Sequence, residues 1–284
     1  MTTALFRSEI DLVPKPNLAT DRCLQDDSGE VGPDPRAVPV RGVRRKIIVK
    51  VASTAEEWEQ AFRLVRQNYL DSGYEPPSTK LLRFTLFHAL PETTVFIAKL
   101  ADEVVGTFTL VPDNRPLGLP LEGLYEDEVE ELRRQGRHLA EVTSLAAKGL
   151  TQREFGQVFQ ALIRLNMQYH DRQGGDTWVL TVNPRHSQFY CKVLGCRALG
   201  PRRAYERVQG HPAEAYWLDR TLLRNVPKMY EQIFGESLSA EVVAPVRMPV
   251  TLIRSLANKS SLIDVLDVDQ VLRRVERGGK TRAW

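Results

Sequence analysis

Residues 118–150, GLPLEGLYEDEVEELRRQGRHLAEVTSLAAKGL, decide the fold because they pass from a charged helix into an apolar strand. Acidic and basic residues dominate residues 125–136, which we predict to be helical, and residues 138–146 form the expected strand. Glu141 is the single carboxylate in that strand. It is a candidate for a chemical role, because charged side chains are rarely buried without a partner or a function.

A second polar motif, VNPRHSQFY at residues 182–190, follows one helix and one strand later. The predicted helix covers residues 153–172 and ends before Gly174 and Gly175, which are a natural C-terminal stop. The other elements expected in this half are a strand at residues 177–182, a helix at 186–194 and a strand region at 198–208.

In the first half, the pattern predicts a strand, an amphipathic helix and then a hairpin. Ser53 stands three residues before Glu56, which is the spacing of a capping box at a helix N-terminus. Ala101 and Asp102 separate two β-branched runs and indicate the hairpin turn. The expected elements are strands at residues 46–51, 93–100 and 103–111, a helix carrying Trp58, Phe62, Val65 and Tyr69, and a short second helix at 80–89.

The two ends of the chain differ from this middle part. Residues 1–42 are rich in Pro, Asp and Gly, and we expect a flexible tail. We assign residues 43–211 to one α/β domain and residues 212–284 to a C-terminal helical extension. Pro227 should kink or break the first helix of that extension, and the amphipathic segment 260–279 should form its last. The extension could cap a ligand tunnel, form a subdomain or dimerise.

Composition excludes several classes of protein. Lys plus Arg number 39 against 36 Asp plus Glu, so no overall charge favours nucleic acid as a partner. The three cysteines fit neither a disulfide framework nor a zinc site, and no two histidines have helical ligand spacing. The sequence contains no run of eighteen apolar residues and no signal-peptide core, so we expect no transmembrane segment. We therefore predict a metal-free cytoplasmic protein.

Four stretches, in this order, resemble a known family: TTVFIAKLADEVVGTFTLVPD, GLPLEG, LRRQGRHLAEVTSLA and NPRHSQFYCKVLGCRALG. Over roughly residues 46–220 the chain resembles the Gcn5-related N-acyltransferase (GNAT) superfamily. It is more similar to the branch of long-chain N-acyl amino acid synthases, which is related to acyl-homoserine lactone synthases. The resemblance implies a central mixed, mostly antiparallel sheet flanked by helices. Two central strands, LAEVTSLA and TWVLTVN, would splay apart to admit an acyl thioester.

The resemblance also implies an activity. The expected enzyme is an acyltransferase that moves a long-chain fatty acyl group from acyl carrier protein to the α-amine of an amino acid. Attack would be direct in a ternary complex, with no bound cofactor or metal, and the donor would be acyl-phosphopantetheine on the carrier or acyl-CoA. The alternatives are an acyl-homoserine lactone synthase-like enzyme, an acetyl-CoA-dependent N-acetyltransferase, or a non-catalytic acyl-binding or sensor module. The acceptor amino acid, the acyl length and the oligomeric state stay open.

Three residues are candidates for catalysis. Glu141 could accept a proton from the amine, or it could be a structural carboxylate paired with Arg137 or another basic neighbour. His186 and Tyr190 are one helical turn apart and would share a face. The resemblance implies that Tyr190 protonates the departing thiolate, although Phe189 and Tyr190 could instead be core aromatics.

Other residues are candidates for binding substrate. Thr143 shares the face of Glu141 on an alternating strand, whereas Ser144 should point away and be structural. Asn183 could bind pantetheine or cap the next helix. Arg83 and Arg137 could hold the acceptor carboxylate. An apolar tunnel for the acyl chain could be lined by Phe84, Phe87, Phe96, Phe108 and Trp178, which are otherwise core residues.

The turn AAKGLTQREFG, residues 146–156, departs from the superfamily pattern. Most coenzyme A users have Gln/Arg-x-x-Gly-x-Gly/Ala here, whose backbone N–H groups bind the pyrophosphate. A single glycine in the turn predicts a weak diphosphate site, which favours a carrier protein, whose pantetheine bears one phosphate. An acidic carrier would meet basic residues that could equally be solvated surface charges: Lys148, Arg153, Arg185, Lys192, Arg202 and Arg203.

Overall fold

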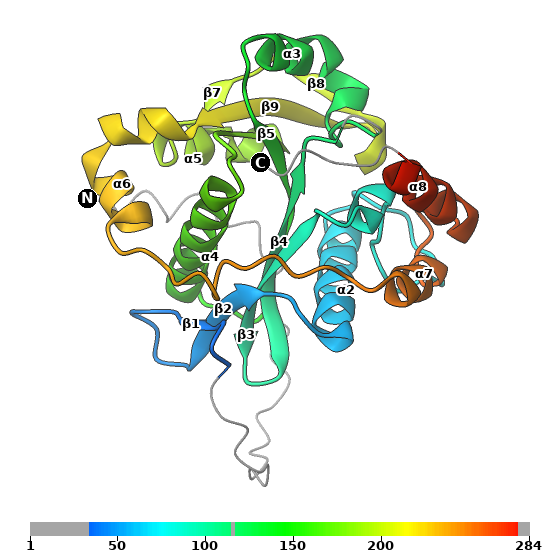
Figure 1. The fold of residues 1–284 in the computed structure, drawn as a ribbon, viewed down its shortest axis with the longest axis horizontal. Helices are drawn as coiled ribbons and strands as arrows, with labels where there is room; N and C mark the ends of the chain where they lie inside the picture. The colour runs from blue at the N-terminus through cyan, green and yellow to red at the C-terminus, as the bar shows by residue number, and fades with distance from the viewer. Residues whose placement is uncertain (1–33, 115–116, 278–284) are drawn as a thin grey trace, which may run out of the picture.

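The computed structural model describes residues 34–114 and 117–277, which are built around one mixed sheet (Figure 1). Its strand order is β1-β2-β3-β4-β5-β6-β9-β7, and β8 pairs with β9 off this path. β5 and β6 are parallel, and every other pairing is antiparallel. The mixed, mostly antiparallel sheet expected from the resemblance is therefore confirmed.

The elements have these bounds. The strands are β1 Val38–Pro39, β2 Ile47–Val51, β3 Thr94–Leu100, β4 Glu103–Pro112, β5 Leu139–Ala147, β6 Thr177–Val182, β7 Arg197–Ala198, β8 Arg203–Tyr205 and β9 His211–Asp219. The α-helices are α2 Ala55–Asp71, α3 Glu122–Arg134, α4 Gln152–Arg172, α5 Ser187–Lys192, α6 Pro227–Phe234, α7 Val250–Asn258 and α8 Val265–Arg277. The 3₁₀ helices are η2 Leu86–Ala89, η3 Pro184–His186, η4 Glu206–Val208 and η5 Arg220–Asn225.

Helices cover both faces of the sheet. On β3, Phe96 and Ala98 belong to the apolar cluster that contains α4, whereas Val95 and Ile97 belong to the cluster of α2, α7 and α8. Because alternate residues of a strand point to opposite faces, α4 and α2 lie on opposite sides. α3 covers the part of the sheet formed by β5, β6 and β9. The central strands are thus covered on both faces, whereas the short strands β1, β7 and β8 are partly or fully exposed.

Two local predictions in the first half need correction. The capping box of α2 is formed by Thr54 and Glu57, one residue later than expected, and Ser53 donates its N–H to the Glu57 carboxylate at 2.8 Å. Residues 80–89 were expected to form a helix, but only η2 is helical. The preceding Leu82 forms a bridge with Ser260 instead, so tertiary pairing overrides the local pattern.

The boundary at residue 212 was also wrong, because residues 211–219 form strand β9 rather than a helix. β9 pairs with β6 along its whole length. Ala215 packs in the cluster under α3, while Tyr216 and Leu218 pack in the cluster of α4. Apolar residues on both faces hide the period of two, which is why the spacing resembled that of a helix.

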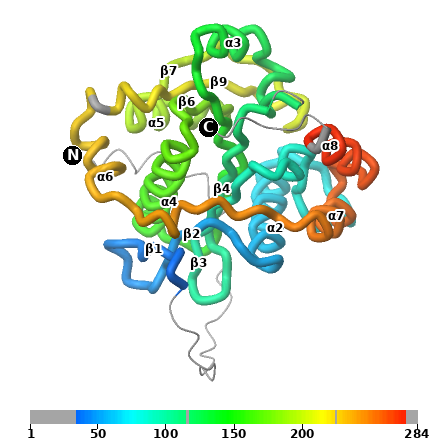
Figure 2. The backbone as a smooth tube through the Cα atoms, in the orientation of Figure 1, coloured from blue at the N-terminus to red at the C-terminus, as the bar shows by residue number. Residues whose placement is uncertain are grey.

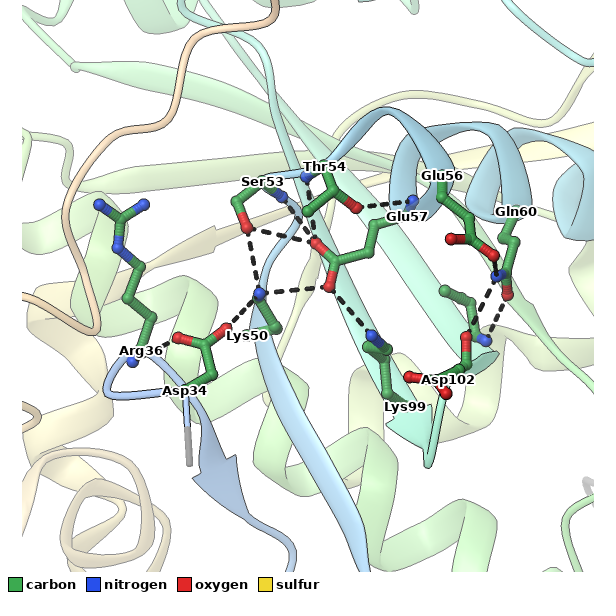
Figure 3. A network of polar contacts seen from close by, with 11 residues as sticks. Asp34, Arg36, Lys50, Ser53, Thr54, Glu56, Glu57, Gln60, Lys99 and Asp102 are labelled. Carbon is green, nitrogen blue, oxygen red and sulfur yellow. Dashed lines mark hydrogen bonds and ion pairs between the residues drawn. The ribbon is translucent and has the colours of Figure 1, made fainter. Parts of the chain in front are cut away.

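The N-terminal segment joins the sheet earlier than expected. Residues 1–33 of the expected tail lie outside the described residues, but β1 pairs with β2. Asp34 forms an ion pair with buried Lys50, which also pairs with Glu57 at 3.2 Å (Figure 3). Burial opposes ionisation of Glu57, but the Ser53 N–H and two lysines outweigh it and lower its pKa. This network ties the segment to the start of α2.

The C-terminal part wraps around the domain. Residues 235–249 run from α6 to α7 as a strap with a turn at residues 240–243 (Figure 2). Gln168 of α4 fixes the strap by donating to the Glu236 carbonyl at 3.0 Å and accepting from the Leu238 N–H at 2.7 Å. Pro227 lies at the start of α6, and the predicted last helix is α8. No helix in the described part of the chain combines the length and apolarity needed to cross a membrane.

Candidate active site

The central opening lies where β5 and β6 separate. Their parallel pairing covers only three pairs and ends at Glu141 with Val179. Beyond it, residues 142–145 and 180–182 line opposite parts of a pocket of about 420 Å³. The splayed central strands implied by the resemblance are therefore present. Backbone groups of β5 that point toward β6 have no ladder partner past this point.

A β-bulge bends β5 at the opening. Thr107 pairs with Ala146 and Thr109 with Thr143, so Phe108 faces two residues instead of one. Ser144, one of those two, has a left-handed φ of 58°. The bulge breaks strict alternation, and both Thr143 and Ser144 line the pocket. The expectation that Ser144 points away was wrong for this reason.

Residues on both faces of the sheet line the pocket, and the two faces differ in the polarity of what they contribute. The lobe on the α4 face is apolar and is lined by Phe108, Val142, Phe159, Ile163, Trp178, Leu180 and Leu194. The lobe on the other face, called the polar lobe here, contains Arg83, His88, Glu141, Tyr205 and Arg207 among apolar residues such as Phe87 and Val111. An apolar chain and a polar small molecule could thus approach each other from opposite faces.

Glu141 lies in the polar lobe, at the last paired position of β5 with β6, and is 1% exposed. The Leu121 N–H donates a hydrogen bond to its carboxylate at 2.7 Å. Burial raises the pKa of Glu141 to about 8, although the Leu121 N–H and the charge of Arg207 act in the opposite direction. Arg137 is not its partner, because Arg137 forms an ion pair with Asp219 at 2.8 Å. The carboxyl can therefore exchange a proton near neutral pH.

His186 and Tyr190 both lie in the pocket wall. Arg185 donates from Nε to His186 Nε2 at 2.9 Å. The Tyr190 ring packs edge-on to Phe189 with centroids 5.4 Å apart, and burial raises the pKa of Tyr190. Tyr190 thus belongs to both the apolar core and the pocket wall.

The predicted substrate-binding residues divide into two groups. Thr143, Asn183 and Arg83 line the pocket, whereas Arg137 does not. Asn183 Oδ1 also accepts the Arg185 N–H at 3.2 Å, so it caps η3 as well. Arg83 is buried against Glu75 at 3.1 Å, with its guanidinium 3.9 Å from the Tyr69 ring centroid.

The basic residues expected to meet a carrier protein are not in the pocket wall. Lys148 pairs with Glu103 at 2.6 Å and Arg202 with Glu214 at 2.7 Å. Arg203 pairs with Glu128 at 2.5 Å and Lys192 donates to Gln188 at 3.1 Å. Arg153 is exposed at the start of α4, and Arg185 donates to the Tyr74 hydroxyl at 3.2 Å. Three of the six, Lys148, Arg202 and Arg203, are therefore already paired with a carboxylate.

Of the five aromatics considered for the tunnel, three line the pocket: Phe87, Phe108 and Trp178. Phe84 packs in the cluster of α2, and Phe96 packs in the cluster of α4. These two are core residues, as their burial at 0% indicates.

Sequence reasoning missed several polar residues of the pocket. Tyr205 donates its hydroxyl to the Pro120 carbonyl at 3.1 Å, and burial raises its pKa. Burial and Arg83 lower the pKa of His88 to about 3, so it is neutral. Arg207 follows β8 in η4. The only sequence signal was the alternation of aromatic and basic residues in RRAYERV, which has no meaning until β8 is known to pair with β9.

Comparisons with known proteins agree with this geometry. The structure of FeeM, an N-acyl amino acid synthase from uncultured soil microbes, matches with a TM-score of 0.54 and 24% identity, covering 67% of this chain and 97% of that one. The acyl-homoserine lactone (AHL) synthase LasI matches with a TM-score of 0.50 and 14% identity, covering 68% and 97%. A comparison with curated proteins finds no match.

The comparison of sequences identifies the family, which similarity of fold alone does not. The profile of the family "N-acyl amino acid synthase FeeM" matches residues 60–219, which is more than half of the 284 residues. The matched range contains β5, β6, the bulge and the polar lobe of the pocket. The chain therefore belongs to the FeeM N-acyl amino acid synthase family and is an acyltransferase of GNAT-like fold.

Proposed function

We propose that this enzyme transfers a long-chain fatty acyl group from acyl carrier protein to the α-amine of an amino acid. The observation that carries the proposal is the pocket lined from both faces of the sheet, with an apolar lobe on one face and, on the other, a polar lobe in which Glu141 marks the point where β5 and β6 separate. The acyl chain occupies the apolar lobe, and the amino acid enters from the polar lobe. The thioester carbonyl then lies at the splay of β5 and β6.

The reaction is a direct attack. The free amine adds to the thioester carbonyl carbon, and the resulting oxyanion accepts a hydrogen bond from a backbone N–H that the splay leaves free. The C–S bond breaks, an amide forms, and the thiolate leaves with the phosphopantetheine arm. One proton leaves the nitrogen and one is taken up by the sulfur, so no other reactant is required.

Glu141 is the proposed acceptor of the amine proton. Its pKa, raised to about 8 by burial, lies near the working pH, which favours a general base. General-base catalysis contributes about 10²–10⁴-fold. Tyr190 and His186 are the candidates for protonating the thiolate, because both lie in the same wall. Tyr190, whose pKa burial raises, would act in its protonated form.

The start of α4 favours a carrier protein over coenzyme A. Glu154 accepts the Thr151 N–H at 2.9 Å and so occupies the helix N-terminus with a negative charge. Arg45 holds both Glu154 oxygens at 2.7 Å, and this pair lowers the pKa of Glu154 to about 2. A diphosphate at this place would meet a fixed carboxylate. A single phosphate attached to a carrier does not need this site.

The proposal is tested by mass spectrometry of the products of the purified protein. Palmitoyl-carrier protein and palmitoyl-CoA are each supplied with a mixture of the twenty amino acids. Formation of an N-acyl amino acid, faster from the carrier protein, is the expected result. Folded protein that makes no such product from either donor would contradict the proposal. Acetyl-CoA and S-adenosylmethionine, added separately, test the acetyltransferase and homoserine lactone alternatives.

A further inference from the structure

Arg207 is a cation in the pocket wall without a partner charge. None of the carboxylates in residues 34–114 and 117–277 forms an ion pair with it. Its guanidinium carbon lies 5.3 Å from the centroid of the Phe87 ring. Arg83, in the same wall, differs because Glu75 holds it at 3.1 Å. Arg207 is also exposed, so its donors can reach a small molecule in the polar lobe.

The place of Arg207 in the lobe matters as much as its charge. Arg207 lies in η4, two residues after Tyr205 at the end of β8, and both line the pocket together with the buried Glu141. The lobe therefore offers a carboxylate at the splay and a cation toward the entrance. An α-amino acid has the complementary arrangement, with its amine and its carboxylate on one carbon.

We infer that Arg207 binds the α-carboxylate of the amino-acid acceptor and selects amino acids over simple amines. The inference rests on the proposed function. A guanidinium presents several N–H donors in a planar fork, which matches the two oxygens of a carboxylate. With the carboxylate at Arg207, the amine faces Glu141. Of the two residues expected from sequence to do this, Arg83 is held by Glu75 and Tyr69, and Arg137 pairs with Asp219 outside the pocket wall.

The experiment compares acceptors that differ only in the carboxylate. Phenylalanine is paired with 2-phenylethylamine, and alanine with ethylamine. Acylation is measured for the wild-type enzyme, Arg207→Gln and Arg207→Lys at alkaline pH, where the Glu141 carboxyl is ionised. The matched control is Arg197→Gln, since Arg197 lies over the Trp217 ring at 5.7 Å but outside the pocket wall. Calorimetric titration of phenylalanine gives a readout of binding without turnover.

For Arg207→Gln, kcat/KM for the amino acids should fall by about 10- to 100-fold, the factor for losing a hydrogen bond between charged groups. kcat/KM for the amines should change less than about twofold, because an amine without a carboxylate does not bind the guanidinium. Arg207→Lys should be intermediate, and Arg197→Gln should match the wild type.

The outcomes separate this inference from the proposed function. Suppose that the wild type acylates amino acids, but Arg207→Gln lowers kcat/KM equally for amino acids and amines, or changes neither value. The carboxylate site at Arg207 is then wrong and the proposed function stands. If the wild type makes no N-acyl amino acid, yet phenylalanine binding weakens in Arg207→Gln, the function is wrong and the site stands. If folded protein neither forms an N-acyl amino acid nor binds phenylalanine, the inference and the proposed function are both overturned.

Discussion

The Leu121 N–H donates a 2.7 Å hydrogen bond to the carboxylate of Glu141, which joins the start of α3 to the point where β5 and β6 separate. Among residues 34–114 and 117–277, the loop that precedes α3 thus supplies the one backbone donor to this buried carboxylate. That single donor does not offset burial, so the pKa of Glu141 rises from its ordinary value of 4.5 to about 8.

Glu141 should make stability depend on pH. Because its pKa is higher in the folded protein, folding takes up a proton between pH 4.5 and about 8, and the free energy of unfolding falls as the pH rises through this window. Glu141→Gln removes the titrating group, so this variant should be the more stable protein at pH 9 and nearly equal at pH 5. Urea unfolding at pH 5, 7 and 9 measures this. Parallel curves for the two proteins would contradict a buried carboxyl with a raised pKa.

Glu154 should give the opposite pH dependence, with a free energy of unfolding that falls as the pH falls. Its hydrogen bonds with Arg45 lower its pKa to about 2, so its stabilisation is present above pH 4.5 and is lost as the pH falls toward 2. Glu154→Gln should lower the free energy of unfolding at pH 7 by about 1–2 kcal/mol, as expected for a charge-assisted bond at a helix N-terminus. The difference should shrink in acid.

The control for Glu154 is Glu131→Gln. Glu131 pairs with Arg134 on the surface of α3, where both side chains are largely exposed. That variant should change stability by less than about 1 kcal/mol at any of these pH values. Equal losses in the two variants would show that Arg45 and Glu154 are an ordinary surface pair.

The apolar lobe should set the length of the acyl chain. Ile163 of α4 is buried and lines this lobe, so Ile163→Phe fills part of it. The ratio of kcat/KM for palmitoyl to octanoyl donors should fall by about tenfold, since several methylene groups lose their contacts. Ile163→Leu, which conserves volume, is the control and should keep the wild-type ratio. An unchanged ratio in folded Ile163→Phe would place the chain elsewhere.

The bulge at Ser144 gives a prediction about stability. Its left-handed φ of 58° disfavours side chains branched at Cβ. Ser144→Val should therefore lower the free energy of unfolding by about 1–2 kcal/mol, whereas Ser144→Gly should be neutral or slightly stabilising. Thermal unfolding of both variants measures the difference. If Val were tolerated as well as Gly, β5 would have no bulge at this residue.

The sequence predicted the elements whose signals are local. α4 has a capping box and a regular apolar face, and the hairpin of β3 and β4 has two clear β-branched runs. Strand β9 was not predictable in the same way, because Ala215 and Tyr216 are buried on opposite faces and no alternation is visible. The family resemblance gave the central splay, which pattern alone does not.

The site was predictable to a similar extent. Glu141 is conspicuous because it is one carboxylate in an apolar strand, and the motif at His186 and Tyr190 follows the second strand of the splay. Tyr205 and Arg207 could not be found, because they lie in the hairpin of β8 and β9, and it is the pairing of β9 with β6 that joins this hairpin to the sheet at the pocket. The side-chain orientation of Ser144 was also predicted wrongly from strict alternation along the strand. The bulge that breaks this alternation depends on the pairing with β4 and is not visible in the sequence of β5.

The most direct test of the account is a single-turnover measurement of acyl transfer from palmitoyl-carrier protein to an amino acid, from pH 6 to 10, in the wild type and in Glu141→Gln. The wild-type rate should rise with pH and level off above about 8, where the carboxyl is ionised. Glu141→Gln should bind the donor normally and transfer about 10²–10⁴-fold more slowly, without that pH dependence. Transfer by Glu141→Gln at the wild-type rate, with the wild-type pH profile, would contradict the role of Glu141.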